Sequence, residues 1–474
     1  MRLYTCSNSA PAQPRGPGQP LHAEVPGGLL PHLLALLQDR GGEWFFPQSP
    51  PRATGWPERS GNIGLHPVAL NDDLQRAHYQ AVSIETLLWL FHYLHETAVS
   101  PAFDARLHRA WGAYRHINGI FAGRMAAACT AARDDQAVVL VNDYHFLLAP
   151  GALVCRGLPA GTRVVYAHQV PWCEPDYFGI LPALIREEIL ASLLSCHAVV
   201  FHSRRWREAF LRCCDRYVPG ARVGDEVVDY RGRSVRVSAV PFPLDVAAVS
   251  GLQRVEATQH WQERFAALAA GRRLLVRVDR LDLWKNQPRG FAAFGELLSR
   301  QPRLAGEVCF LAVSAPVRYQ SARHRAYAAE CEASAARVNE TTAAAGRSPP
   351  VHLLRPVNLA ESRPMAVAAL AQAAAVLVNP TYDGFNLVAK EALLLSADAP
   401  VLLSQNAGAH EYLAPAVIPV EPFDVTSTAR ALEGALAPGG PGRPAGATAV
   451  REQLREDAAA GWLAAVLDGA VLDG

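Results

Sequence analysis

Short runs of apolar residues alternate along the chain with longer segments of helical periodicity. Eight of these runs are apolar throughout, without the polar alternation of a half-exposed strand. They cover residues 138–142, 163–168, 198–203, 274–279, 308–313, 351–356, 375–380 and 399–404. A parallel strand that is buried on both faces requires this pattern. Strands that alternate with helices predict βαβ units and an α/β fold with doubly wound sheets.

A proline-containing break divides the pattern into two halves. The stretch VPFPLDVAAVSG carries two prolines, and proline donates no backbone hydrogen bond and disrupts regular elements. We therefore expect an interdomain linker there, at 240–251. The domains that follow from it are an N-terminal domain, a C-terminal domain and a terminal helical segment, at 1–243, 244–445 and 446–474.

Smaller features mark turns and loops. The segment before the linker predicts a β-hairpin that turns at Arg231-Gly232. Residues 9–28 are rich in proline and glycine and follow an expected first strand, so they predict a mobile loop inside the N-terminal domain. A second loop of this composition covers 435–447, and a final helix is expected at roughly 449–468.

Composition narrows the function classes. The chain has 474 residues, half of them apolar, and a formal net charge of +1. This balance argues against nucleic acid as a partner, because binding to phosphate backbones needs clustered Lys and Arg. No apolar run is long enough to span a membrane, and no signal peptide is visible, so a cytoplasmic protein is expected. The nine cysteines are scattered without a C-x-x-C pair, which favours reduced thiols over a zinc site.

The segment VDRLDLWKN, at 278–286, follows a buried strand and carries Arg280 and Lys285. Ligands of open α/β sheets bind at the carboxyl ends of the strands. Two cations at that edge suit a diphosphate, because Arg binds two oxygens at once and Lys acts as a point charge. A surface loop with incidental charges is the alternative.

The segment NPTYDGFNLVAKEALLL, at 379–395, predicts a strand end, a turn and a helix that begins near Gly384 or Phe385. Backbone N–H groups in the first turn of a helix form an anion site. They would belong to Asn386, Leu387 and Val388. Asp383 stands just before this start, where its carboxylate could bind a ligand or merely cap the helix.

A third segment covers 141–150 and 166–178. Asp143 follows one expected strand and His168 ends the next, so both are expected at the same carboxyl edge. A carboxylate and an imidazole there can bind sugar hydroxyls. The alternatives are a turn-forming Asp and a structural, hydrogen-bonded His.

Together these segments resemble the trehalose-6-phosphate synthase family. DYHFLLAP is similar to the family's D-Y-H-L segment, and AHQVPW resembles H-I-P-F/W. VDRLDLWKN resembles R-L-D-x-x-K-G, and DGFNLVAKEALL is close to D-G-M-N-L-V-A-K-E. Order and spacing agree over roughly residues 1–425. The resemblance implies two facing Rossmann-like domains of the GT-B type, with the active site in the interdomain cleft and a C-terminal helix that packs back on the N-terminal domain.

The resemblance also implies roles for individual residues. The implied catalytic residues are Asp143, His168, Arg280 and Lys285. The implied donor-binding residues are Gly27, Gly28, Asp383, Gly384, Asn386, Leu387, Val388 and Glu391, of which Glu391 would hold the nucleotide ribose. The implied acceptor-binding residues are Tyr79, Trp89 and Arg318.

Several positions depart from the family pattern. The family opens with S-N-R, whose arginine contacts the acceptor phosphate, whereas Ser9 stands at that place in this chain. The family's G-W-x-G is replaced by a segment that begins at Trp44, and Asn142 and Asn286 replace a common His and Gly. These departures concern mainly the acceptor half, so they leave the acceptor in question and not the class of chemistry.

The resemblance implies a retaining transfer of glucose from UDP- or GDP-glucose to glucose 6-phosphate, which gives trehalose 6-phosphate without a cofactor or metal. No carboxylate is obviously placed as a nucleophile. The resemblance implies front-face displacement, in which the enzyme supplies position and charge. One alternative is a related transferase or pseudo-glycosyltransferase that uses another phosphorylated polyol or a cyclitol. Another is a regulatory homologue that binds sugar phosphate without turnover. A homo-oligomer stays open.

Overall fold

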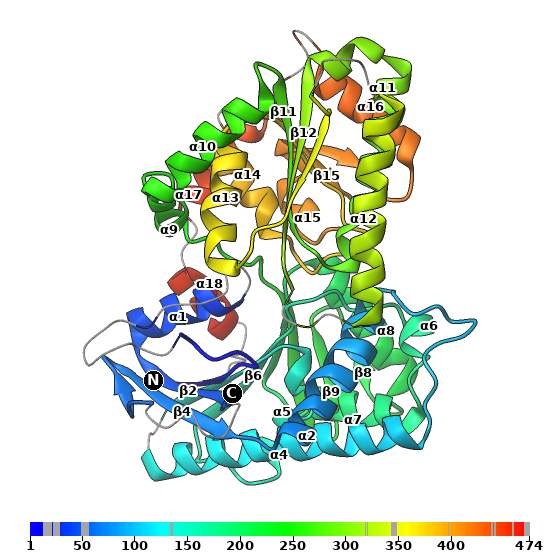
Figure 1. Ribbon diagram of the computed structural model, residues 1–474. Coiled ribbons are helices and arrows are strands. Elements are labelled where there is room, and N and C mark those ends of the chain that lie inside the picture. Colours follow the sequence, from blue (N-terminus) through cyan, green and yellow to red (C-terminus); the bar gives the residue numbers. More distant parts are fainter. Residues whose placement is uncertain are drawn as a thin grey trace. The chain divides into compact units, whose positions relative to one another are not determined.

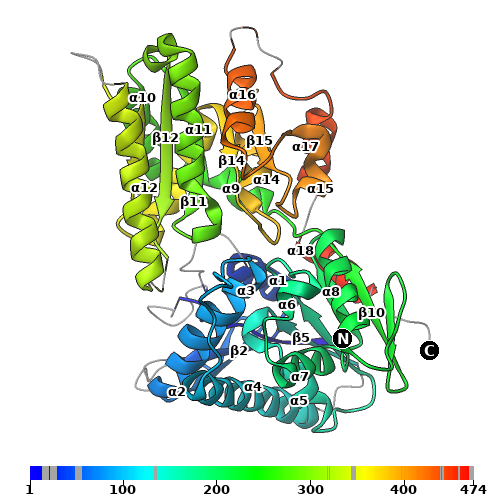
Figure 2. The same cartoon turned by 90° about the vertical axis from the view of Figure 1, so that its right-hand side faces the viewer.

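The computed structural model describes most of the chain (Figures 1 and 2). The described residues are 1–12, 21, 29–48, 56–132, 136–317, 319, 321–342, 348–396, 398–437, 439, 442–456 and 459–468. The chain divides into two compact units, Met1–Phe242 with Ala459–Gly474, and Pro243–Ala458. The division between them falls inside the predicted linker, where two prolines flank the boundary.

The first unit is built on one large sheet. Its strands are β1 Arg2–Cys6, β2 Gly42–Gln48, β3 Arg59–Ser60, β4 Ile63–Ala69, β5 Ala137–Asn142, β6 Thr162–Ala167, β7 Ala198–Phe201, β8 Arg222–Val223, β9 Val227–Tyr230 and β10 Arg233–Ala239. In the described residues their order is β3-β4-β2-β1-β5-β6-β7-β10-β9-β8, with antiparallel pairing only at the two edges. Strand order therefore reverses between β1 and β5, which is the switch point where α/β sheets bind ligands.

Helices cover both faces of this sheet. They are α1 Leu29–Arg40, α2 Asp72–Arg76, α3 Trp89–Phe91, α4 Ala105–Ala132, α5 Ala149–Val154, α6 Pro175–Phe178, α7 Ala183–Leu193, α8 Arg204–Tyr217 and α18 Ala459–Asp468, with a π-helical segment Ala77–Leu88 before α3. α1 and α18 pack together on one face, and α4, α5 and α7 lie on the other (Figure 1). Local signals start several of these helices. The side chain of Ser203, for example, accepts the N–H of Trp206 and caps α8.

The second unit has a smaller, wholly parallel sheet. Its strands are β11 Arg273–Arg280, β12 Val308–Ala315, β13 Val351–Leu354, β14 Ala373–Val378, β15 Val401–Ser404 and β16 Ile418–Val420. Among the described residues their order is β13-β12-β11-β14-β15-β16, the 3-2-1-4-5-6 order of a Rossmann sheet. Every residue of β12 is buried. The switch point lies between β11 and β14.

Helices also sandwich the second sheet. They are α9 Val246–Leu252, α10 Glu256–Ala269, α11 Gln287–Arg300, α12 Ala322–Thr341, α13 Leu359–Ala371, α14 Leu387–Leu395, α15 His410–Leu413, α16 Val425–Ala435 and α17 Ala447–Glu456. α11, α12 and α16 lie on one face, and α10, α13, α14 and α17 lie on the other (Figures 1 and 2). The chain thus contains two Rossmann-like α/β units, as the alternation of strands and helices predicts.

Most local predictions match these elements. The eight apolar runs coincide with β5, β6, β7, β11, β12, β13, β14 and β15. The hairpin turns at Arg231 and Gly232, which have φ values of 49° and 74° and link β9 to β10. The expected final helix is instead two helices in different units, because α17 packs against α14 while α18 packs against α1. In the described residues, no helix has both the length and the apolar character to cross a membrane.

Candidate active site

The loop after β11 presents Arg280 and Lys285 in different surroundings. β11 ends at Arg280, whose side chain is 51% exposed and pairs with Asp282 at 2.7 Å. Lys285 ends a short 3₁₀ turn, and only 11% of its side chain is exposed. The shielded ammonium has a stronger field because less water screens it, whereas the exposed guanidinium can turn toward a ligand. The pair suits an anion at the carboxyl edge of the sheet.

An ion pair joins this loop to the turn after β14. The Lys285 Nζ atom lies 2.6 Å from Oδ2 of Asp383, and Nδ2 of Asn386 donates to the same oxygen at 2.9 Å. The backbone of Asp383 forms a one-residue parallel bridge with Ala407. Main chain and side chain therefore both fix this carboxylate. A carboxylate held in this way can orient the hydroxyls of a sugar.

Helix α14 begins slightly later than predicted. Its first residue is Leu387, and Asn386 is the N-cap, with φ 85° and a side chain that accepts the N–H of Ala389. The capping alternative for Asp383 is therefore wrong, because Asn386 fills that role. The N–H groups of Leu387 and Val388 lie in the first turn as predicted, where the helix dipole favours an anion. Gly384 lies in the turn that precedes them.

Asn286 explains one departure from the family pattern. Its φ is 60°, a left-handed conformation that Gly adopts most readily and Asn tolerates best among the other residues. Its side-chain Nδ2 donates to the carbonyl of Asn379 at 2.9 Å and to that of Pro422 at 2.7 Å. The replacement of Gly by Asn thus keeps the turn and adds two hydrogen bonds that link three loops at this edge.

A buried ion pair below the loop was not predicted from the sequence. Arg277 is fully buried, and its guanidinium donates to Oδ2 of Asp279 at 3.0 and 2.7 Å. The Nη2 atom of Arg277 also donates to the carbonyl of Lys285 at 2.8 Å. Arg277 therefore supports the backbone that carries the candidate cation. The available signal was the pair of opposite charges two positions apart inside the strand, since such residues share a face.

Glu391 lies in the second turn of α14 with its side chain almost wholly buried. Its Oε1 pairs with Nη1 of Arg363 from α13 at 2.7 Å. In the described structure this carboxylate is thus engaged by a neighbouring helix. A ribose contact for Glu391 stays a prediction.

In the first unit, Asp143 has a strained backbone. Its φ and ψ are 69° and 170°, a region that glycine alone adopts readily. The backbone N–H of Asp143 donates to the carbonyl of Ala167, and Oδ1 of Asp143 accepts from the N–H of Gln169 at 3.1 Å. Burial raises the pKa of the Asp143 carboxyl from 3.8 to about 7. Strain and a raised pKa at the switch point are typical of a functional residue.

His168 is fully buried. Its Nδ1 accepts from the Tyr166 hydroxyl at 2.9 Å, and its Nε2 donates to the carbonyl of Pro171 at 3.2 Å. Burial lowers the pKa of the ring to about 3, so the imidazole is neutral. Both ring nitrogens have protein partners, which agrees with the structural alternative. A contact between His168 and a sugar stays a prediction.

The two aromatic candidates of the first unit lie in different surroundings. Tyr79, in the π-helical segment, stacks on His145 with ring centroids 5.9 Å apart. It therefore lies beside the loop that carries Asp143. Trp89 begins α3, is 9% exposed, and contacts the ring of His95 edge-on at 6.1 Å. Gly27, Gly28 and Arg318 lie outside the described residues, as does most of the predicted loop 9–28.

The other three departures from the family pattern have structural counterparts beside β1. The Trp44 indole N–H donates to Ser7 Oγ at 2.9 Å, and the Ser7 hydroxyl donates to the carbonyl of Ser9 at 2.7 Å. Nδ2 of Asn142 donates to the Oγ1 of Thr5 at 2.9 Å and so ties β5 to β1. Trp44 and Ser9 are thus linked through Ser7, whereas Asn142 stabilises the pairing of β5 with β1.

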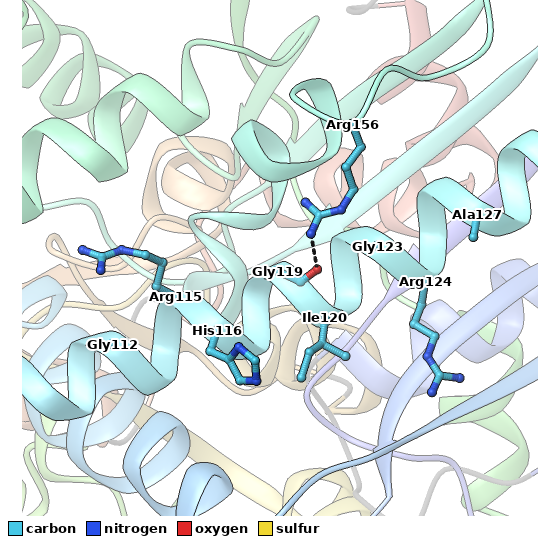
Figure 3. Close-up of a pocket in the computed structure, with 9 residues that line it drawn as sticks. All are labelled: Gly112, Arg115, His116, Gly119, Ile120, Gly123, Arg124, Ala127 and Arg156. Carbon is cyan, nitrogen blue, oxygen red and sulfur yellow. Dashed lines mark hydrogen bonds between the residues drawn. The ribbon is translucent and has the colours of Figure 1, made fainter.

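A shallow groove of about 660 Å³ lies elsewhere in the first unit (Figure 3). It runs along the outer face of α4, where Gly112, Gly119 and Gly123 leave space. Arg156 reaches over it and donates to the carbonyl of Gly119 at 3.1 Å. None of the sequence-predicted site residues lines this groove.

Comparison with known proteins places the chain in a family. Curated relatives include the UDP-forming α,α-trehalose-phosphate synthase of Pichia angusta, 29% identical over 78% of this chain and 75% of its own. The second such synthase of Aspergillus niger is 28% identical over 92% of this chain and 89% of its own.

Solved structures share the fold. The E. coli trehalose-6-phosphate structure bound with UDP-2-fluoro glucose superposes with a TM-score of 0.85, 22% identity and 99% coverage of both chains. The α,α-trehalose-phosphate synthase of Burkholderia xenovorans in complex with glucose-6-phosphate gives a TM-score of 0.83 and 24% identity, and the match covers 99% of this chain and 100% of that chain. The sequence model of the family described as glycosyltransferase family 20 matches residues 37–469 of this chain. Because that match covers most of the chain, the protein belongs to glycosyltransferase family 20 and is a glycosyltransferase of the trehalose-phosphate synthase type.

Proposed function

We propose that the protein transfers glucose from UDP-glucose to glucose 6-phosphate, with retention of configuration, and forms trehalose 6-phosphate. The observation that carries this proposal is the ion pair between Lys285 and Asp383. It joins the loop that begins at Arg280 to the turn that leads into the N-terminus of α14. Cations, a fixed carboxylate and helical N–H groups are the groups that a diphosphate-linked sugar requires. The UDP-forming synthases among the relatives support uracil as the base of the donor nucleotide.

The donor is assigned to the second unit. Arg280 and Lys285 would neutralise charge that builds on the leaving diphosphate, and the first turn of α14 would add its N–H groups. The Asp383 carboxylate would orient the glucosyl hydroxyls, and Glu391 would bind the ribose. For the last contact, Glu391 has to exchange part of its pairing with Arg363 for a ribose hydroxyl.

The acceptor is assigned to the first unit, around Asp143 and Tyr79. A carboxyl group with a pKa near 7 exchanges a hydrogen-bonded proton readily at neutral pH. Tyr79 would contact the acceptor ring. We propose that the departing phosphate of the donor helps to deprotonate the attacking hydroxyl of the acceptor. The protein then accelerates the reaction by position and charge, without a covalent intermediate.

A matrix of two donors and several acceptors tests this function. UDP-glucose and GDP-glucose are each incubated with glucose 6-phosphate, other phosphorylated polyols and a cyclitol phosphate. Nucleotide release and product mass are measured, and anomeric coupling constants report configuration. We expect UDP release that depends on glucose 6-phosphate and an α,α-linked product.

Each other outcome of the matrix has a definite meaning. Turnover only with another acceptor would overturn the acceptor assignment and would agree with Ser9 at the place of the family's arginine. Binding of UDP without turnover with any acceptor would identify a regulatory homologue. Repetition with EDTA tests the prediction that no metal is needed, because activity should persist.

A further inference from the structure

The loop that follows β5 needs support from outside itself. Asp143 is held in a conformation that costs free energy for any residue other than glycine. Such a backbone persists only where surrounding groups fix it. Within the loop, the N–H of Phe146 donates to the carbonyl of Asp143 at 3.0 Å. Asp143 itself is also bound by Ala167 and Gln169, and the residues that follow it are supported by helix α4, which is distant in sequence.

Two buried side chains of α4 bind this loop. Tyr114 and Asn118 are one helical turn apart and therefore share a face. The Tyr114 hydroxyl donates to the carbonyl of Tyr144 at 2.6 Å and accepts the N–H of Leu147 at 3.0 Å. One phenol thus satisfies both a donor and an acceptor of the loop backbone.

Asn118 binds the same loop in the same two-sided manner. Its Nδ2 donates to the carbonyl of His145 at 3.1 Å, and its Oδ1 accepts the N–H of Leu148 at 3.0 Å. Its Nδ2 also donates to the carbonyl of Tyr114, which fixes the amide relative to its own helix. Together the two side chains engage four backbone groups within five successive residues.

A third side chain, His78, also binds this loop and lies next to Tyr79, the candidate acceptor contact. Nε2 of His78 donates to the carbonyl of His145 at 2.9 Å, and burial lowers the pKa of the His78 ring to about 4. His78 precedes Tyr79, which stacks on the His145 ring. The loop therefore links the candidate acid to the candidate aromatic contact.

We propose that Tyr114 and Asn118 are positioning residues for the transfer, because they hold the loop from Asp143 to Leu148 in its one productive conformation. The inference rests on the proposed function of Asp143. Neither side chain touches substrate. Both act by removing alternative conformations of the loop, and a displacement of about 1 Å in a reacting group can lower turnover about 100-fold.

Two variants with matched controls test the proposal. Tyr114→Phe removes only the hydroxyl, and its control is Tyr217→Phe, which removes a hydroxyl that donates to the carbonyl of Pro175 at 2.8 Å. Asn118→Leu removes the amide. Its control is Asn339→Leu, whose amide also binds a backbone N–H and a backbone carbonyl, both of Val351. The controls lose the same kind of hydrogen bond outside the candidate site.

Turnover, the KM for glucose 6-phosphate, the Kd for UDP and the thermal midpoint are measured for all four variants. We expect kcat of Tyr114→Phe and Asn118→Leu to fall about 10- to 100-fold at temperatures where each is folded, with the Kd for UDP within about twofold of wild type. The controls should keep kcat within about twofold. Variants of Tyr114 and Asn118 that match their controls in kcat, or that lose UDP binding in proportion to turnover, would overturn the proposal.

Crystal structures separate a failure of this inference from a failure of the proposed function. If the wild-type protein transfers no glucose to glucose 6-phosphate, the proposed function is wrong. The inference is then tested by the backbone conformation of the loop from Asp143 to Leu148 in crystal structures of the variants. The inference then predicts that Asp143 leaves its positive-φ conformation in Asn118→Leu, while the control keeps it. An unchanged loop in both Tyr114→Phe and Asn118→Leu would contradict the inference whatever the activity.

Discussion

The Lys285 ammonium and the Asp383 carboxylate lie 2.6 Å apart, although 98 positions separate them in the sequence. Lys285 follows β11 and Asp383 follows β14, and these two strands are neighbours at the switch point of the second sheet. The strand order therefore turns two distant motifs into one site. This pair leads directly to the first prediction.

Breaking the pair should impair both turnover and stability. Lys285→Ala removes a positive charge from the proposed diphosphate site, so we expect kcat to fall about 10²–10³-fold. A double-mutant cycle with Asp383→Asn should give a coupling free energy of about 1–3 kcal/mol in urea unfolding, because both side chains are shielded from water. Additive effects on unfolding would show that the contact is absent in solution.

Arg280→Ala should lower turnover without lowering stability. The side chain is 51% exposed, so its loss should change the free energy of unfolding by no more than about 0.5 kcal/mol. Its proposed charge stabilisation of the leaving group predicts a fall in kcat of about 10²–10³-fold. Arg303→Ala is the control, because that arginine is 61% exposed and lies after α11. Near-wild-type turnover of Arg280→Ala would contradict the assigned role.

The pH dependence of stability should reveal Asp143. The pKa of its carboxyl is raised from 3.8 to about 7 in the folded protein, so the folded state retains this proton where the unfolded chain has lost it. The group therefore stabilises the fold fully below about pH 4, and that contribution is lost as the pH rises through about 7.

The neutral variant Asp143→Asn should gain stability relative to wild type as the pH rises from about 4 to about 8. Urea unfolding at several pH values measures the difference, and Asp225→Asn, at an exposed turn, is the control. A constant difference between wild type and Asp143→Asn across this range would show that the carboxyl has an ordinary pKa.

Gly290 should not tolerate a methyl group. A Cβ atom there would clash with Nη1 of the buried Arg277, which supports the Lys285 backbone. Gly290→Ala should therefore destabilise the protein by about 1–3 kcal/mol. In Gly434→Ala the new Cβ meets nothing within 4 Å, so this control should gain about 0.5–1 kcal/mol from helix propensity. Equal midpoints of the two variants in denaturant would contradict the packing around Arg277.

The pattern of apolar residues predicted the interior strands, because a strand buried on both faces consists of apolar residues. A strand such as β5, buried at all six positions, has to be apolar whatever surrounds it. β2 and β4 were not predicted, because each contains a proline, Pro47 and Pro67, and β2 also contains the charged Glu43. They pair with each other near the sheet edge, where Pro67 lies opposite Phe46. Only the assembled sheet makes room for such residues in a strand.

The sequence by itself determined the family and the motifs that carry the chemistry, because contiguous segments such as 379–395 encode a strand end, a turn and a helix start locally. The tertiary structure alone decided which groups meet. It brought Lys285 into contact with Asp383 and buried His168 next to Tyr166 and Pro171. It also placed the Arg277 side chain against the backbone of Lys285. The physical reason is that contacts between distant residues depend on the order in which the strands pair, and no local pattern of residues records that order.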